Sequence, residues 1–145
     1  MSRILVVDDL VASRESLAKL LQREGYEVAG ARNGAEALQR LKEGGIDLIL
    51  LDHMMPEVDG LTFLSGIRRF PKWKNLPVIM FTGLKDRNHL MKAQTLGVKE
   101  YLVKSEYTMQ DMMNLIRKHL QPANNSLEMP LGGTAMSSTP TPAAG

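Results

Sequence analysis

The chain of 145 residues contains no cysteine and only seven aromatic residues, one of them tryptophan. The absence of cysteine excludes disulfides, thiolate catalysis and cysteine-ligated metal centres. No apolar run approaches the roughly 20 residues that cross a bilayer, so no membrane contact is expected. Met1-Ser2-Arg3 leads straight into an apolar run, which leaves no room for a signal peptide. We therefore expect a cytoplasmic location, in keeping with the lack of disulfides.

The chain also lacks a large excess of charge of either sign. It has 18 basic and 16 acidic residues, for a net charge of +2. This is too small to indicate binding to nucleic acid, which usually needs a broad basic face. One basic cluster, which we interpret as a solvated helix end and loop, consists of Arg68, Arg69, Lys72 and Lys74. No direct contact with nucleic acid is expected.

Apolar runs alternate with helix-like segments five times along the chain. Continuous or alternating apolar residues predict strands at 3–7, 26–29, 47–51, 78–81 and 100–103. Apolar residues at helical spacing predict helices at 11–24, 34–43, 61–69, 86–97 and 108–120. Asn33 is expected to cap the second helix, and Thr108 and Asp111 have the spacing of a capping box. The methionines of the last helix, among them Met109, are expected in the core.

This alternation predicts an α/β fold with a five-stranded parallel sheet, doubly wound, with helices on both faces. The strand order 2-1-3-4-5 fits best, because the alternating strand 26–29 is suited to a sheet edge. We expect one domain over residues 1–121. Residues 122–145 are rich in Pro, Ala, Ser, Thr and Gly and contain no basic residue. They are expected to form a disordered tail, or a linker cut short of a further domain.

Polar residues suited to phosphoryl chemistry follow four of the expected strands. They are Asp8 and Asp9, Asp52, Thr82, and Lys104. Ligands of parallel α/β sheets bind outside the carboxyl ends of the strands, so these side chains should converge on one point. Three carboxylates offer the oxygen ligands that Mg²⁺ prefers. Asp52 ends the central strand and is the best candidate nucleophile, while Lys104 and Thr82 could stabilise phosphoryl oxygens.

The three histidines carry less information about function. His53 adjoins Asp52 and is a candidate modulator of the site. His89 and His119 lie in predicted helices. No spacing groups the three as metal ligands, so we interpret them as structural or surface residues.

The combination of motifs resembles the receiver domain of two-component response regulators, specifically single-domain, chemotaxis-regulator-like members. The resemblance covers residues 2 to about 121 and includes Asp52 followed by Met55-Pro56 and Asp59-Gly60. Its other segments are 4–9, 33–38, 77–83 and 101–104. The resemblance implies a flavodoxin-like fold of strand order 2-1-3-4-5. It also implies a phosphorylation-controlled signalling switch.

In such a switch Asp52 would accept a phosphoryl group from the phosphohistidine of a sensor histidine kinase or a phosphotransfer protein. Asp9, Asp52 and the backbone carbonyl of Met54 would bind Mg²⁺, with Mn²⁺ as an alternative and with Asp8 acting mainly through water. The resemblance implies self-phosphorylation from a phosphodonor and slow autodephosphorylation, so the protein is not a conventional enzyme.

The resemblance further implies that Lys104 contacts the phosphoryl group and that Thr82 and Tyr101 form a switch pair. The signal would pass to an unknown downstream protein through the face formed by residues 85–120. One residue departs from the family pattern: Ser105 stands where the family usually has a proline, often after a cis bond. A cis bond before a non-proline residue costs about 2.5–4 kcal/mol, so the bond should be trans or the loop strained.

Four alternatives remain. A phosphatase of the haloacid-dehalogenase type would need a second Asp two residues after the nucleophile, where this chain has Met54. A flavodoxin-like cofactor binder would have a first loop rich in hydroxyls and glycines, whereas Asp8 and Asp9 would repel a phosphate. Ser105 keeps open a pseudo-receiver, an interaction module that is not phosphorylated. The chain could also be the receiver fragment of a larger multidomain regulator or hybrid kinase.

Overall fold

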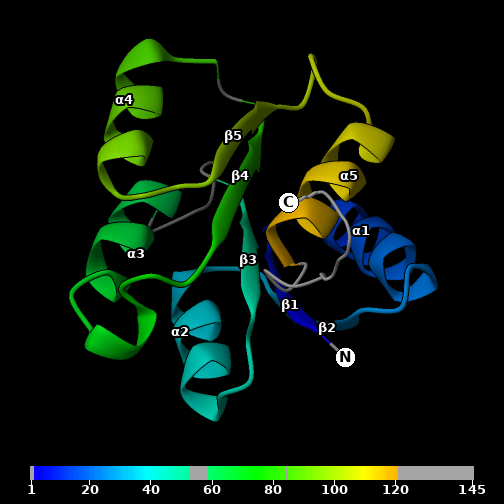
Figure 1. Cartoon of the computed structure of the whole chain (residues 1–145), viewed down its shortest axis with the longest axis horizontal. Coiled ribbons are helices and arrows are strands. Elements are labelled where there is room, and N and C mark those ends of the chain that lie inside the picture. The colour runs from blue at the N-terminus through cyan, green and yellow to red at the C-terminus, as the bar shows by residue number, and fades with distance from the viewer. Residues whose placement is uncertain (1, 53–58, 84, 121–145) are drawn as a thin grey trace, which may run out of the picture.

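The computed structural model describes residues 2–52, 59–83 and 85–120 of the chain. Five parallel strands form one sheet in the order β2-β1-β3-β4-β5, which confirms the expected fold (Figure 1). The strands are β1 (Arg3–Val7), β2 (Glu27–Ala31), β3 (Leu48–Leu51), β4 (Val78–Thr82) and β5 (Glu100–Val103). Because all strands run the same way, their carboxyl ends meet at one edge of the sheet.

Helices cover both faces of the sheet, as Figure 1 shows. Helices α1 (Val11–Arg23) and α5 (Met109–Leu120) cover one face. The other face carries α2 (Gly34–Glu43), α3 (Gly60–Ile67) and α4 (Arg87–Thr95), and a short 3₁₀ helix, η1 (Pro71–Trp73), leads into β4. Within the described ranges, no helix is long and apolar enough to span a bilayer.

The sheet separates two hydrophobic cores. Leu5 and Val7 of β1 join the buried cluster beneath α2, α3 and α4. Ile4 and Val6, which alternate with them, join the cluster beneath α1 and α5. Side chains of a strand point alternately to opposite faces, so a strand buried on both sides must be apolar throughout. This is why the central strands appear in the sequence as continuous apolar runs.

Side-chain caps fix several helix beginnings. Asn33 Oδ1 accepts from the Glu36 amide at 2.8 Å, as the sequence predicts. Thr108 and Asp111 form a reciprocal capping box, each backbone amide donating to the other side chain, at 2.9 and 3.0 Å. Asp86 Oδ1 accepts from two amides of the first turn of α4. These bonds satisfy amides that have no partner inside the helix.

Three expectations about the elements need correction. Strand β2 occupies Glu27–Ala31 instead of 26–29, because β1 pairs with it as far as Ala31 and the end of α1 holds the Tyr26 amide. Helix α3 ends at Ile67 instead of residue 69. Met109 is 44% exposed, so it is not a core residue, whereas Met112 is fully buried. Met109 is the first residue of α5.

Arg68 is not the solvated residue that we predicted. Its guanidinium donates to the carbonyls of Trp73 and Leu76 at 2.8 and 2.7 Å and of Leu96 at 2.9 Å. A longer contact of 3.4 Å reaches the carbonyl of Gly97. Partial burial lowers the pKa of Arg68 below its usual range. Arg68 therefore joins the ends of α3 and α4 and the segment before β4.

Candidate functional site

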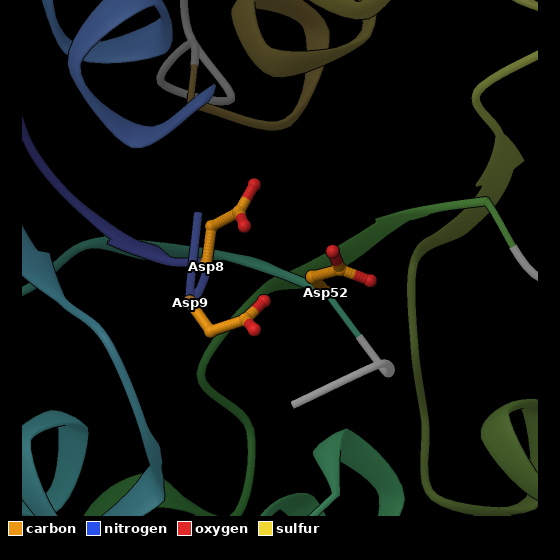
Figure 2. Close-up of side chains that lie close together, drawn as sticks. All are labelled: Asp8, Asp9 and Asp52. Atoms are coloured by element: carbon orange, nitrogen blue, oxygen red, sulfur yellow. The ribbon is translucent and has the colours of Figure 1, made fainter. Parts of the chain in front are cut away.

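Three carboxylates meet at the carboxyl edge of the sheet. Asp8 and Asp9 follow β1 and Asp52 follows β3, which are neighbouring strands (Figure 2). One carboxylate oxygen from each residue lies within 4.8 Å of the others. Asp8 and Asp52 are only 2% and 6% exposed, whereas Asp9 is accessible to solvent. The sequence predicted this convergence, and the structure brings all three together.

Hydrogen bonds fix the position of Asp8. Its Oδ2 accepts from the Ser13 hydroxyl at 2.6 Å, and its Oδ1 accepts from the Leu10 amide at 3.0 Å. The Arg14 guanidinium donates to the Asp8 backbone carbonyl at 2.7 Å. The start of α1 therefore holds Asp8 in place. Sequence reasoning missed Ser13, although a hydroxyl one helical turn beyond an Asp pair is a recognisable signal.

Lys104 provides a cation next to the buried carboxylates. Its Nζ lies 3.4 Å from Asp52 Oδ2 and 3.6 Å from Asp8 Oδ2. The same ammonium lies 5.7 Å from the centre of the Phe81 ring. These contacts orient it toward the point where the carboxylates meet. The predicted proximity of Lys104 to Asp52 is therefore observed.

The bond between Lys104 and Ser105 is trans, because the described residues contain no cis peptide bond. This agrees with the first of the two alternatives that Ser105 left open. The Lys104 amide donates to the Thr82 carbonyl at 2.7 Å, and the Glu106 amide turns back to Val103 at 2.8 Å. The lysine thus reaches both carboxylates without the proline that the family usually has.

Thr82 and Tyr101 lie on adjacent strands next to this site. Thr82 is fully buried and is the last residue of β4, one position later than the strand end that we predicted. Tyr101 is partly buried, and its backbone pairs with Met80 of β4. Burial raises the pKa of Tyr101 above its usual value, and the charges of Asp86 and Asp52 add to the effect. Tyr101 is thus within electrostatic reach of Asp52.

A surface ion pair joins the two loops beyond Thr82 and Tyr101. The Lys85 ammonium contacts the Glu106 carboxylate, and this hydrogen bond raises the pKa of Lys85. Lys85, Glu106 and Tyr101 line one hollow of about 340 Å³ between α4 and the end of β5. Sequence reasoning missed this pair, because the two residues are 21 positions apart.

The remaining predicted residues lie elsewhere. Met54, whose carbonyl was expected to bind metal, and His53 lie outside the described residues. His89 sits beside the capping carboxylate of Asp86 at 3.2 Å, and His119 contacts Glu100 at 2.9 Å. Neither is among the described residues that group as candidate metal ligands, which are the three aspartates.

The sequence and the fold of this chain are similar to those of known proteins. A model of the response regulator receiver domain matches residues 4–117. The chain belongs to this family. It is 42% identical over 103 residues to the CAI-1 autoinducer sensor kinase/phosphatase CqsS of Vibrio cholerae, covering 70% of this chain and 15% of that protein. It is 38% identical over 105 residues to the chemotaxis protein CheY of Treponema pallidum, covering 70% and 72%.

A solved structure shares both fold and sequence with this receiver domain. The response regulator TrrA of Thermotoga maritima, in complex with Mg²⁺ and BeF, superposes with a TM-score of 0.73 at 37% identity. The match covers 83% of this chain and all of that one. By contrast, the chain spans only a small part of the sensor kinase named above. The protein is thus a receiver domain of two-component signalling.

The three aspartates fit a divalent cation by their chemistry. Mg²⁺ takes oxygen ligands, is usually held by one or two carboxylates, and keeps several waters. Asp9 is accessible to solvent, so waters can reach the point where the carboxylates meet. Three carboxylates this close also repel one another, and a cation relieves that repulsion.

Proposed function

We propose that this receiver domain accepts a phosphoryl group on Asp52 from the phosphohistidine of a sensor histidine kinase or a phosphotransfer protein. The main support for the proposal is that the Asp52 carboxylate lies between two other carboxylates and a lysine ammonium. Asp8 and Asp9 supply the acidic side, and Lys104 Nζ lies 3.4 Å from the Asp52 carboxylate. Such a site binds the metal and the phosphoryl group together.

In the transfer, a carboxylate oxygen of Asp52 attacks phosphorus, the P–N bond to the imidazole breaks, and a P–O bond forms. The product is an acyl phosphate, and the imidazole nitrogen takes up a proton. The Lys104 ammonium and the Thr82 hydroxyl stabilise the charge on the phosphoryl oxygens. Asp8, Asp9 and Asp52 would hold Mg²⁺, which would supply further neutralising charge there. Mn²⁺ has the same ligand preference.

Water attack on the acyl phosphate returns Asp52 to its free state, so the signal is transient. The chain has Met54 where a haloacid-dehalogenase-type phosphatase would have its acid/base aspartate. The acyl phosphate therefore decays slowly, and the protein is a switch with weak self-directed phosphatase activity.

The phosphoryl group on Asp52 draws the Thr82 hydroxyl toward it, and the Tyr101 ring moves into the space vacated. Both states pre-exist, and phosphorylation shifts their populations. The signal then reaches a downstream protein through residues 85–120, which include α4, β5 and α5. The kinase and the downstream protein would meet this domain in the cytoplasm.

The alternative is a pseudo-receiver that is not phosphorylated, which Ser105 keeps open. The contacts of Lys104 argue against it, since the lysine reaches Asp52 and Asp8 although Ser105 replaces the proline. A role as one receiver within a longer hybrid kinase is compatible with the match to the CqsS protein.

Intact-mass spectrometry after incubation with acetyl phosphate and Mg²⁺ tests the proposal. Wild-type protein should gain one phosphoryl group, and Asp52→Asn should gain none, because the amide removes the nucleophile at nearly constant volume. Glu15→Gln, on the exposed side of α1, is the matched control and should be phosphorylated like the wild type. An unmodified wild-type mass would instead favour the pseudo-receiver. Phosphorylation of Asp52→Asn would show that another residue is the nucleophile.

A further inference from the structure

The positive charge of the chain is concentrated in one region. The segment from Gly60 to Lys99 contains a single acidic residue, Asp86, although the net charge of the chain is only +2. Its eight basic residues are Arg68, Arg69, Lys72, Lys74, Lys85, Arg87, Lys92 and Lys99. The rest of the chain is correspondingly acidic. The segment includes α3 and α4, so this flank of the molecule attracts anions.

Several of these cations already have partners. Arg68 donates to backbone carbonyls, Lys72 lies 4.8 Å from the centre of the Trp73 ring, and Lys85 contacts Glu106. Arg69 and Lys92 differ from them. Within the ranges that the structure describes, neither has a carboxylate within ion-pair distance, and both are exposed. Their charges are therefore available to a ligand.

Arg69 and Lys92 line the same groove between α3 and α4. The groove has a volume of about 630 Å³ and is open to solvent. Its lining consists of Leu61, Thr62, Ser65, Gly66, Arg69, Lys92, Thr95 and Leu96. No acidic side chain is among these residues, and none of them belongs to the phosphoryl site. The volume lies within the roughly 300–1,000 Å³ of small-molecule sites.

The chemistry of the groove divides into a polar and an apolar part. The Arg69 guanidinium, the Lys92 ammonium and the Thr62 and Ser65 hydroxyls are donors that suit phosphate oxygens. Thr95 contributes less, because its hydroxyl donates to the Met91 carbonyl at 3.1 Å. Leu96, which is partly exposed, supplies apolar surface, whereas Leu61 is largely buried. Gly66 leaves the wall open, because an added Cβ would have no atom within 4 Å.

We propose that the α3–α4 groove binds a small phosphate-bearing ligand with a flat apolar group, of the nucleoside diphosphate class. Arg69 and Lys92 contact the phosphates, and the base lies against Leu96 and the exposed edge of Leu61. This site is separate from Asp52 and does not depend on phosphorylation there. Because both cations are exposed, affinity falls as salt concentration rises.

A titration of the ¹⁵N-labelled full chain with ADP, followed by backbone amide NMR, tests the proposal. EDTA keeps divalent metal away, so the three aspartates of the phosphoryl site repel phosphate. Saturable shifts are expected at Ser65, Gly66 and Lys92. Pyrophosphate should bind more weakly because it lacks the base, and adenosine should bind weakest because it lacks charge. Binding of adenosine as tight as that of ADP would overturn the assignment of Arg69 and Lys92 as phosphate ligands. Binding of pyrophosphate as tight as that of ADP would overturn the proposed contact between the base and the apolar side chains.

Variants distinguish specific binding of ADP in the groove from non-specific attraction to a basic surface. Arg69→Gln and Lys92→Gln should each weaken ADP binding about fivefold or more, as expected for losing a charged hydrogen-bond donor. Gly66→Leu should block the groove without a clash, and a thermal melt verifies its fold. Lys74→Gln removes an exposed cation outside the groove and should leave the affinity within about twofold, as for a screened surface charge. A loss of ADP affinity in Lys74→Gln equal to that in the groove variants would refute the site, as would the absence of saturable shifts in the wild type.

Discussion

Lys104 shares one ammonium between two buried carboxylates. Its distances to Asp52 and Asp8 differ by little, at 3.4 and 3.6 Å. Removing one partner of a buried ion pair leaves the other charge uncompensated. The resulting loss in the free energy of unfolding exceeds the net stabilisation that the pair provides. Lys104 therefore contributes to stability in the metal-free protein, in addition to its proposed contact with the phosphoryl group.

Lys104→Met should lower the free energy of unfolding by about 1–2 kcal/mol in EDTA, a value reduced from the buried-pair range because the lysine is partly exposed. Mg²⁺ should raise the melting temperature of the variant more than that of the wild type, since the metal replaces the missing charge. Thermal melts with and without Mg²⁺ measure both effects. Lys99→Met, at an exposed position, is the control. Identical melts of Lys104→Met and wild type in EDTA would disprove this role.

Tyr101, which we propose as a switch residue, is influenced by the charge of Asp52. Burial is the main cause of its raised pKa, and the Asp86 and Asp52 charges follow. As the pH rises past about 10, the Tyr101 hydroxyl loses its proton in the unfolded chain before it does so in the folded protein. The stability that Tyr101 contributes is therefore present below pH 10 and is lost at higher pH. Asp52→Asn should therefore lower the Tyr101 pKa slightly. A ¹³C-tyrosine NMR titration measures it, and Tyr26 is the internal reference. An unchanged Tyr101 pKa would show that Asp52 does not influence the ring.

The central strands could be predicted closely from the sequence, and the edge strand β2 less well. Strands β1, β3 and β4 match the predicted limits to within one residue, because burial on both faces requires continuous apolar runs. The β2 strand differs because Gly30 and Ala31 have little intrinsic strand preference. Their pairing with Val6 and Val7 keeps them in the sheet, and this partner is distant in sequence.

The same reasoning explains which parts of the site were predictable. Residues that directly follow strands, such as Asp52 and Lys104, could be placed because parallel topology brings strand ends together. The role of Arg68 could not be predicted. It depends on carbonyls of Leu96 and Gly97, which are 28 and 29 positions away and carry no side-chain signature.

Arg68 joins α3, α4 and the segment that leads into β4, so its replacement should destabilise all three. Arg68→Met should lower the free energy of unfolding by about 2–4 kcal/mol, since partly buried carbonyls lose their donors. Arg68→Lys should recover only part of this, because an ammonium cannot reproduce the planar guanidinium. Urea unfolding measures the loss. Arg69→Gln, next in sequence but exposed, should change stability by less than about 0.5 kcal/mol. Equal effects at positions 68 and 69 would contradict this structural role.

Signalling requires that a change at Asp52 reach the far side of β5. Thr82 and Tyr101 are on adjacent strands, and Lys85 and Glu106 join the loops beyond them. A coupling of about 1–3 kcal/mol is typical of such switches. Under the proposed mechanism, the signal would pass between these neighbouring side chains.

Backbone amide NMR with beryllofluoride, a phosphoryl mimic, tests this transmission. In the wild type, shifts should extend from the loops around Asp52 into residues 85–120. In Thr82→Ala, the mimic should still bind at Asp52, but the shifts at Tyr101 and along α4 should be much smaller, because the hydroxyl that responds to the phosphoryl group is gone. Wild-type shifts confined to the immediate surroundings of Asp52 would rule out the mechanism, as would full-size distant shifts in Thr82→Ala.

Trp73 is the only tryptophan of the chain, and it precedes the amino end of β4, whereas the aspartates follow the carboxyl ends of β1 and β3. It is buried and packs edge-on against Phe70, with ring centres 5.3 Å apart. The four residue steps from Val78 to Thr82 place roughly 13 Å of strand between this region and the phosphoryl site. We therefore expect Trp73 to be an intrinsic optical probe of global unfolding whose emission does not respond to metal binding or phosphorylation at Asp52. Wild-type and site variants can be compared on one fluorescence baseline without an added dye.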